Sequence, residues 1–373
     1  MFIREQITLP NDPLMLVRAL GVPQAQDATA ALLSAVRRLH GERVFVAGPG
    51  ATATAAWAAR IGAQVTVWTS HLGEAETLRA TFAENALPPP TLRLQADFAG
   101  LSAESQTLAL LHLPRGRTLQ REHLRLAAAL LRPGGRLYVV GAKREGVKRA
   151  IEEARELFGR IGVLAKKGGY HAAVTERPEG AFALPEVTYE TTDVRVAGEP
   201  TRLVSRSGVF AAGQLDDGAA ALIAGMRVAP GQRVLDLGCG TGLVGLAALR
   251  EGARVTAVDV SARAVASTRR TWAANGYPDA ESMLSIGASA VAQRRFDVVV
   301  TNPPFHKGAG VDFEVAQRFI ADAARVLHPE GQLYLVANAF LKYRPWLQAH
   351  FTHVETAWET ARYRVYRARI SKT

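Results

Sequence analysis

The sequence predicts an α/β protein in which one domain occurs twice, and three observations support this. Apolar strands alternate with amphipathic helices along most of the chain. A glycine-rich turn follows an apolar strand at residues 48–50 and again at 238–242. The segments around these turns, 44–85 and 234–275, match without gaps at a constant offset of 190 residues. Strands separated by helices of this length predict a parallel sheet covered on both faces.

Length and composition predict two globular domains. The chain has 373 residues, of which 48% are hydrophobic and 21% charged. No apolar run approaches the about 20 residues that a membrane span needs, and the N-terminus lacks the pattern of a secretory signal. We therefore expect a cytoplasmic protein without membrane contact. The single cysteine, Cys239, excludes a multi-thiolate centre, and the nine histidines show no ligand spacing, so we expect no metal.

The net charge of +11 points to an acidic partner. Of the 45 basic residues, 38 are arginines and seven are lysines. The planar fork of arginine suits phosphate groups, so the composition favours a nucleic-acid partner. Replacement of lysine by arginine in a GC-rich or heat-adapted genome is the alternative.

The elements of the second copy can be read in order. Residues 233–237 form a strand, 243–252 a helix, 254–260 a strand, 261–276 a helix with Ser261 as N-cap, 296–305 a strand and loop, 315–327 a helix and 332–340 a strand. A hairpin with its turn at 197–199 is predicted at 186–206, which divides the chain into domains 1–185 and 186–373. Residues 362–370 alternate polar and apolar side chains, which predicts an edge strand that either contacts phosphate or discourages aggregation.

The glycine turn of the second copy predicts a cofactor site. Glycines allow a sharp turn and a close approach of the backbone to a ligand at the carboxyl end of a strand. Asp259 ends the next strand, 17 residues beyond the turn, where a carboxylate accepts ribose hydroxyls. The pattern predicts a nucleoside-containing cofactor, with a nicotinamide dinucleotide as the first alternative. The residues in question are Asp236, Gly238, Cys239, Gly240, Gly242 and Asp259.

A second motif, Asn302-Pro303-Pro304-Phe305, follows the apolar strand at 296–301. The prolines stiffen the loop. The side-chain oxygen of Asn302 and the carbonyl of Pro303 offer two acceptors for the hydrogens of an exocyclic amine. Phe305 offers an aromatic face to a base lifted out of its stack. We assign the catalytic role to these four residues.

The glycine turn, the acidic strand end and the NPPF loop together resemble the S-adenosylmethionine-dependent amino-methyltransferases. The resemblance implies a Rossmann-like fold over 186–373, with Asn302 also lining the cofactor pocket and a backbone contact to the adenine at Ala288. The segment 207–223, NPPFH, VANAFLKYRPWL and the RYRVYRA tail resemble the bacterial RsmC family, guanine-N2 methyltransferases of small-subunit ribosomal RNA with a defunct N-terminal copy. The resemblance implies S-adenosylmethionine as cofactor and 16S rRNA, in the assembled 30S subunit, as substrate.

The first copy has lost the residues of this chemistry. Val46, Thr52, Thr69 and His112 stand where Asp236, Gly242, Asp259 and Asn302 stand in the second copy. The apolar pattern is retained, so we expect a degenerate domain with the same fold. Residues 132–177 hold eleven basic and five acidic side chains, which favours RNA docking; support of the catalytic domain is the alternative. Because the duplication supplies a domain contact internally, we expect a monomer.

Four other functions stay open at this stage. The related large-subunit enzymes of the RlmG type share the tandem plan and methylate guanine N2 in 23S rRNA. Sites of the NPPF type also methylate adenine N6 or a protein glutamine. A non-enzymatic RNA-binding assembly factor would require the second copy to be inactive.

Overall fold

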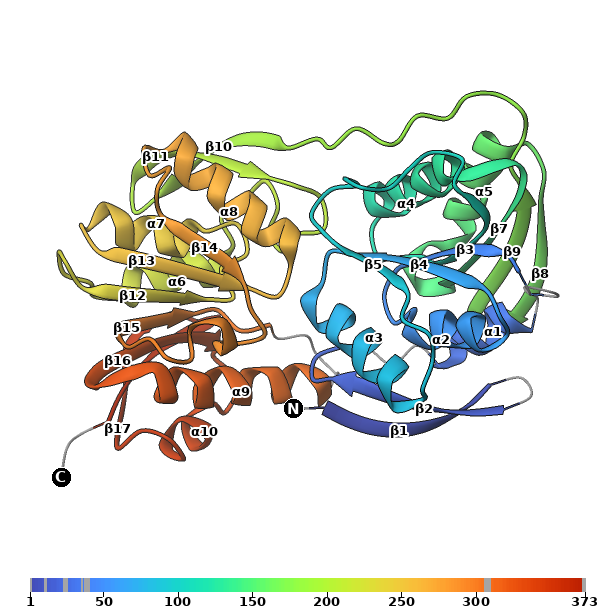
Figure 1. Cartoon of the computed structure of the whole chain (residues 1–373). Helices are drawn as coiled ribbons and strands as arrows, with labels where there is room; N and C mark the ends of the chain where they lie inside the picture. Colours follow the sequence, from blue (N-terminus) through green and yellow to red (C-terminus); the bar gives the residue numbers. More distant parts are fainter. Residues whose placement is uncertain are drawn as a thin grey trace. The chain divides into compact units, whose positions relative to one another are not determined.

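The computed structural model describes residues 2–9, 12–22, 26–34, 36, 41–304 and 310–370. Contacts divide the chain into two compact units, Met1–Val187 and Thr188–Thr373. Figure 1 shows the first unit in blue to green and the second in yellow to red. Each unit contains one seven-stranded sheet with helices packed on it.

The first unit begins with a two-stranded hairpin, β1–β2, and its sheet has the order β5-β4-β3-β6-β7-β9-β8. Its strands are β1 (Phe2–Leu9), β2 (Asp12–Ala19), β3 (Arg43–Ala47), β4 (Gln64–Thr69), β5 (Thr91–Leu94), β6 (Gln106–His112), β7 (Leu131–Ala142), β8 (Ile161–Lys167) and β9 (Tyr170–Glu176). Its helices are α1 (Gln26–Leu33), α2 (Thr52–Arg60), α3 (Leu72–Glu84), α4 (Arg117–Leu130), the short 3₁₀ turn η1 (Lys143–Glu145) and α5 (Val147–Phe158).

The second unit repeats this plan, with a hairpin β10–β11 and a sheet of order β14-β13-β12-β15-β16-β18-β17. Its strands are β10 (Glu190–Val196), β11 (Glu199–Ser205), β12 (Arg233–Leu237), β13 (Arg254–Asp259), β14 (Glu281–Leu284), β15 (Phe296–Thr301), β16 (Leu327–Asn338), β17 (His353–Glu359) and β18 (Tyr363–Arg369). Its helices are α6 (Asp217–Gly225), α7 (Leu243–Arg250), α8 (Ala262–Ala274), the 3₁₀ turn η2 (Ser289–Val291), α9 (Gly310–Val326) and α10 (Arg344–Gln348).

The two sheets agree in strand order, direction and register. In each, five strands are paired in parallel, and the last two strands join the sheet through antiparallel pairs, so that only β18 and its counterpart β9 run against the other strands. Arg43 pairs with Gln64 and Arg233 with Arg254, which reproduces the sequence offset of 190 in the strand pairing. The predicted duplication and the predicted parallel sheet are confirmed.

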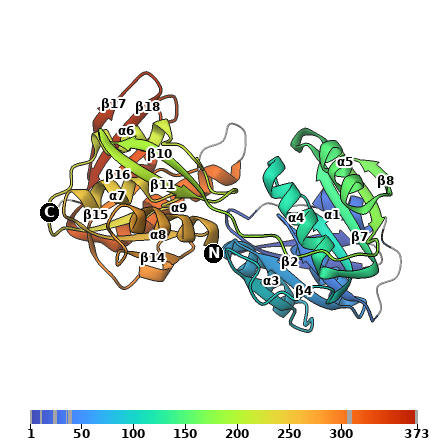
Figure 2. The same ribbon diagram turned by 90° about the horizontal axis from the view of Figure 1, so that it is seen from above.

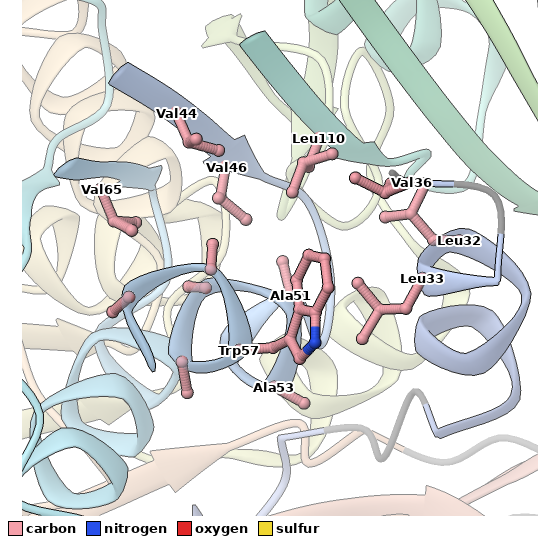
Figure 3. Close-up of a cluster of buried hydrophobic side chains, with 14 of the residues drawn as sticks. Leu32, Leu33, Val36, Val44, Val46, Ala51, Ala53, Trp57, Val65 and Leu110 are labelled. Atoms are coloured by element: carbon pink, nitrogen blue, oxygen red, sulfur yellow. The ribbon is translucent and has the colours of Figure 1, made fainter. Parts of the chain in front are cut away.

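Both faces of each sheet are buried, as a parallel sheet requires. Along β3, Val44 and Val46 pack into one core, and Phe45 and Ala47 pack into the other. Figure 3 shows the first of these cores, where Leu33 lies near Trp57 of α2. Trp57, Trp68 and Trp272 are all buried, with exposures of 8%, 2% and 0%.

A hairpin is hydrogen-bonded to a helix in each unit. In the second unit, Thr271 and Asn275 of α8 bind the backbone of β11. The predicted hairpin at 186–206 is confirmed, with its turn between Val196 and Glu199. In the first unit, Thr81 and Asn85 of α3 bind β2 in the same way. The sequence did not predict this first hairpin.

The prediction that residues 362–370 form an edge strand is wrong. β18 lies between β16 and β17, and β17 is the edge strand (Figure 2). Two arginines of β18 pair with carboxylates of β17, Arg364 with Glu359 and Arg367 with Glu355, and Arg362, just before β18, pairs with Asp217 of α6. Arginines in ion pairs with neighbouring elements and arginines at a solvated edge look alike in the sequence of one strand.

Candidate active site

The candidate site lies in the second unit, at the carboxyl ends of the parallel strands β12, β13 and β15. β12 leads into the glycine turn, where Gly238, Gly240 and Gly242 have φ values of +80°, +56° and +79°. L-residues with side chains rarely adopt these values, so the turn requires glycine. A Cβ at Gly238 would lie 2.9 Å from the ring of Phe319, whereas one at Gly240 would meet no atom within 4 Å. Gly240 therefore faces open space on the side where a ligand would bind.

Helix α8 holds the glycine turn in place from behind. The indole Nε1 of Trp272 donates to the Gly242 carbonyl at 2.7 Å. The Thr268 hydroxyl lies 3.1 Å from the Gly240 carbonyl and 3.2 Å from the Cys239 sulfur. Burial raises the pKa of the Cys239 thiol well above its usual value, and the charges of Asp259 and Asp236 raise it further. A thiol in this state is not a nucleophile, so Cys239 serves as a small buried residue.

Asp236 at the end of β12 is a buried acid. It is 3% exposed, and its Oδ2 accepts the backbone N–H of Gly245 at 2.9 Å. Burial raises the pKa of Asp236 to about 7; the hydrogen bond from Gly245 opposes the rise and the charge of Asp259 adds to it. A cationic ligand group beside this carboxylate would favour its ionised form.

Asp259 at the end of β13 is tied to the glycine turn. Its Oδ2 accepts the N–H of Gly240 at 3.0 Å, and its Oδ1 accepts the N–H of Ser261 at 2.9 Å. The predicted N-cap role of Ser261 is confirmed by the geometry of α8. An ionised carboxylate has about four acceptor positions. Asp259 can therefore bind ribose hydroxyls and keep both backbone contacts.

The amide of Asn302, just beyond β15, has a fixed orientation. Its Nδ2 donates to Oδ2 of Asp216 at 3.1 Å, and its Oδ1 is buried without a hydrogen-bond partner among the described residues. Asp216 also accepts the N–H groups of Gly218 and Ala219, at 2.9 and 3.1 Å. Because a carboxylate only accepts, the NH₂ group of Asn302 must face Asp216, which leaves Oδ1 as the open acceptor.

Sequence analysis did not assign Asp216 to the site. Its position before α6 indicates a helix N-cap, and the structure shows this cap. The contact with Asn302 joins residues 86 positions apart in the sequence, so local pattern does not reveal it. Gly218 allows the approach, since a Cβ there would lie 2.9 Å from Oδ2 of Asp216 and 3.3 Å from Nδ2 of Asn302.

A narrow cavity of about 50 Å³ joins the glycine turn to Asn302. Of the residues predicted from sequence, Asp236, Gly238, Cys239, Gly240 and Asn302 line it. Three further lining residues, Phe210, Ala211 and Gln214, come from the segment before α6 and were not assigned from sequence. The glycines at 208 and 213, both with positive φ, are the sequence signal of the tight turns that bring this segment over the cavity.

The remaining predicted residues are placed as follows. Pro303 is buried and Pro304 is exposed, whereas Phe305 lies outside the described residues. Ala288 is fully buried, and its N–H donates to Asp322 at 2.9 Å. Its backbone donor is thus already used within the fold, so it is not open to an adenine. The sequence predicted a backbone contact from Ala288 to the adenine. It did not show that Asp322 of α9, 34 residues further along the chain, accepts the N–H of Ala288.

The corresponding place in the first unit is filled by protein. A Cβ at Gly48 would lie only 1.7 Å from the carbonyl oxygen of His112, so the turn packs directly on the strand end. His112, at the position of Asn302, is buried, and Nε2 of its ring lies 2.8 Å from the Thr54 hydroxyl. Burial lowers the pKa of His112 to about 4. The side chain is a neutral core residue where the second unit has the Asn302 amide.

The described residues contain neither a candidate metal centre nor a candidate membrane-spanning helix. No group of three or more His, Cys, Asp and Glu side chains suited to a metal ion occurs in them. Within the same ranges, no helix is long and apolar enough to cross a membrane.

The second unit has a sheet of this order, a glycine turn after the first parallel strand and an Asn-Pro-Pro loop at the same edge. Together these features define a Rossmann-like methyltransferase. Two family models agree: the methyltransferase small domain matches residues 200–367, and its N-terminal domain matches 30–166. The chain belongs to the ribosomal RNA small subunit methyltransferase C (RsmC) family. The predicted family and fold, two tandem Rossmann-like domains, are confirmed.

Individual relatives match over nearly the whole chain. The ribosomal RNA small subunit methyltransferase C of Pseudomonas aeruginosa (strain LESB58) is 37% identical over 309 residues, 82% of this chain and 89% of that protein. The protein of the same name from Stutzerimonas stutzeri (strain A1501) is 35% identical over 92% of this chain and 99% of its own. The solved structure of a T. thermophilus 16S rRNA N2 methyltransferase (RsmC), in complex with AdoMet and guanosine, is 31% identical with a TM-score of 0.84, covering 99% of this chain and 98% of that one.

Proposed function

We infer that this protein transfers a methyl group from S-adenosylmethionine to the exocyclic N2 of a guanine in 16S ribosomal RNA. The observation that supports this most directly is the Asn302 amide, whose NH₂ group is held by Asp216 and whose buried Oδ1 has no partner among the described residues. An exocyclic amine supplies the N–H donor that this oxygen lacks. The solved 16S rRNA methyltransferase at 31% identity supports guanine as the base and the small subunit as its source.

The residues at the carboxyl edge fit S-adenosylmethionine. Gly240 offers an open backbone face, Asp259 has acceptor capacity for ribose hydroxyls, and the buried carboxylate of Asp236 favours a cationic neighbour. We propose that these residues, with Gly238 and Asn302, hold the cofactor. When bound, it supplies the methyl group in an activated form, attached to a sulfonium.

The protein's own contribution is to bind and orient the amine. Asn302 Oδ1 and, we propose, the Pro303 carbonyl accept the two amine hydrogens and hold the nitrogen in one orientation. Acceptance of an N–H by Oδ1 also stabilises the positive charge that develops on nitrogen as the new N–C bond forms. Fixing the nucleophile in line supplies a large part of the rate enhancement, because the entropy of alignment is lost on binding. Phe305 is proposed to stack on the flipped base.

The remaining assignments are proposals about the chain as a whole. We propose that residues 186–373 carry the reaction and that 1–185 dock RNA or support the catalytic domain. The substrate is proposed to be the assembled 30S subunit, and the enzyme to act as a metal-free monomer in the cytoplasm.

Methyl transfer from radiolabelled S-adenosylmethionine to isolated 30S subunits, 50S subunits and naked rRNA tests the function. The expected product is N2-methylguanosine, confined to 30S material. Label in 50S subunits would show that the substrate is 23S rRNA. N6-methyladenosine would show that the base is adenine, and label only in protein would show that RNA is not the substrate.

The Asn302→Ala variant tests whether the Asn302 amide holds the amine of the base. It should lose at least about 100-fold in kcat, as for loss of a donor or acceptor at a reacting centre. Cofactor binding by calorimetry should weaken much less, because Asp236, Gly240 and Asp259 still hold the cofactor. Turnover close to that of the wild type would show that Asn302 does not hold the amine.

A further inference from the structure

Lysine is rare in this chain, and its distribution is uneven. Of seven lysines, four lie between residues 143 and 167 of the first unit. Lys143 begins η1 directly after β7, Lys148 lies in the first turn of α5, and Lys166 lies near the end of β8. All three side chains are exposed.

The fold brings these lysines together at the carboxyl edge of the first sheet. Lys166 is the direct cross-strand partner of His171 in the β8–β9 pair. The backbone N–H of Lys143 donates to the Gly169 carbonyl in the β8–β9 turn, at 2.8 Å. α5, which holds Lys148, packs on β8 and β9, and Figures 1 and 2 both show it beside β8. The pKa of His171 is lowered by burial and then by the charges of Lys166, Lys148 and Lys143, so all three act on one side chain.

The charges of these lysines are not compensated. Within the described ranges, none of the three forms an ion pair. Three of the four carboxylates on η1 and α5 are engaged with arginines: Glu145 with Arg115 at 2.6 Å, Glu153 with Arg117 at 2.7 Å, and Glu152 with Arg155. The fourth, Glu156, is exposed, as is Asp27 of α1, which lies beside Gly168 in the β8–β9 turn.

The second unit shows that the fold does not require this cluster. Tyr170 and Tyr363 end equivalent strand pairs, so His171 and Arg364 occupy equivalent positions. Arg364 faces Glu359 and forms an ion pair with it, whereas His171 faces Lys166. Because the pKa of His171 is lowered, its ring is neutral at neutral pH, and Lys166 gains no cross-strand ion pair of the kind that Arg364 has. The stability of the sheet therefore does not explain the cluster.

We propose that Lys143, Lys148 and Lys166, together with His171, form a surface that binds the backbone phosphates of ribosomal RNA. The proposal rests on the inferred rRNA substrate and deepens it, because it names the surface of the degenerate unit that docks the RNA. Ammonium groups bind phosphate as point charges and donate up to three hydrogen bonds each. Three uncompensated ammonium groups that all act on one histidine can each neutralise a phosphate of the same stretch of RNA backbone.

The test variant combines Lys143→Gln, Lys148→Gln and Lys166→Gln in the full-length chain. Binding to naked 16S rRNA is measured between 50 and 200 mM salt. Each lost phosphate contact lowers the slope of log K against log salt by about 0.7 to 0.9, so three contacts lower it by about 2 to 3. The wild type should therefore lose about 20- to 40-fold more affinity over this salt range than the variant. KM for RNA should rise, with kcat and cofactor binding unchanged.

A matched control removes three exposed arginines from the second unit. Arg233, Arg254 and Arg295 line a groove at the amino ends of the strands, and their change to Gln alters the net charge by the same amount. The control should keep the wild-type slope. An equal drop in the slope in both triple variants would show that the effect comes from net charge alone and would overturn the proposal. A test variant with the wild-type slope would also overturn it, and so would a wild type whose RNA binding is independent of salt.

Nucleoside analysis of the wild-type product separates this proposal from the inferred function. If no N2-methylguanosine forms but the slopes differ as expected, the inferred reaction is wrong and the RNA surface stands. If N2-methylguanosine forms and the slopes are equal, only the surface is wrong.

Discussion

Replacement of Gly218 by alanine should misplace the Asn302 amide without unfolding the protein. The new Cβ would lie 2.9 Å from Asp216 Oδ2, and 3.3 Å from both Asn302 Nδ2 and Tyr363 Cε1. An ordinary contact needs at least 3.4 Å, so the Asp216 carboxylate must move by about 0.5 Å and Asn302 moves with it. Because a misplacement of about 1 Å costs about 100-fold in rate, we expect kcat to fall by about 10- to 100-fold.

The stability of this variant should change little. Alanine is favoured over glycine inside a helix by about 1 kcal/mol, which offsets part of the strain at the start of α6. We expect Tm within about 4 °C of the wild type, since about 1 kcal/mol shifts Tm by 2–4 °C in a domain of this size. Single-turnover methylation of 30S subunits gives kcat, and calorimetry gives Tm and the cofactor affinity.

Gly162→Ala is the matched control. A Cβ at Gly162 in β8 would meet no atom within 4 Å, and this glycine does not have a positive φ. The control should keep full activity. Wild-type kcat in Gly218→Ala would refute the argument, and so would a large fall in Tm with a parallel loss of cofactor binding, since that would indicate unfolding of the site.

Two further predictions concern the cofactor side of the site. Because the folded pKa of Asp236 is about 7 against an ordinary 3.8, its contribution to stability is present below about pH 4 and is lost as the pH rises to about 7. The unfolding free energy of Asp236→Asn relative to the wild type should therefore rise by up to about 4 kcal/mol between pH 4 and 8. Denaturant titrations measure this difference, and a difference that does not change with pH would contradict the raised pKa. Trp272→Phe removes the donor to the Gly242 carbonyl and leaves this acceptor buried, at a cost of about 1–3 kcal/mol. If this cost falls on the cofactor-binding conformation of the turn, cofactor affinity by calorimetry should weaken by about 5- to 150-fold. An unchanged affinity would show that the glycine turn does not depend on the indole.

The sequence by itself determined the fold and the cofactor side of the site. The duplication could be read because the glycine turns and the strands around them match at one offset, and the strand pairing reproduces that offset. Asp236, the glycines, Asp259 and Asn302 could be named because each stands at the end of a predicted strand. Their proximity follows from the parallel direction of the strands, which brings all carboxyl ends to one edge of the sheet.

The tertiary structure decided what depends on contacts between distant segments. The alternation in β18 did not show that carboxylates of β17 would cover its arginines. The role of Asp216 depends on a contact with Asn302, and the loss of the donor at Ala288 depends on Asp322 of α9. In the same way, only the β8–β9 register and the packing of α5 place Lys166 and Lys148 near one histidine. Local pattern fixes which residues share a strand or a helix face, whereas side-chain partners are set by pairing and packing between elements far apart in the chain.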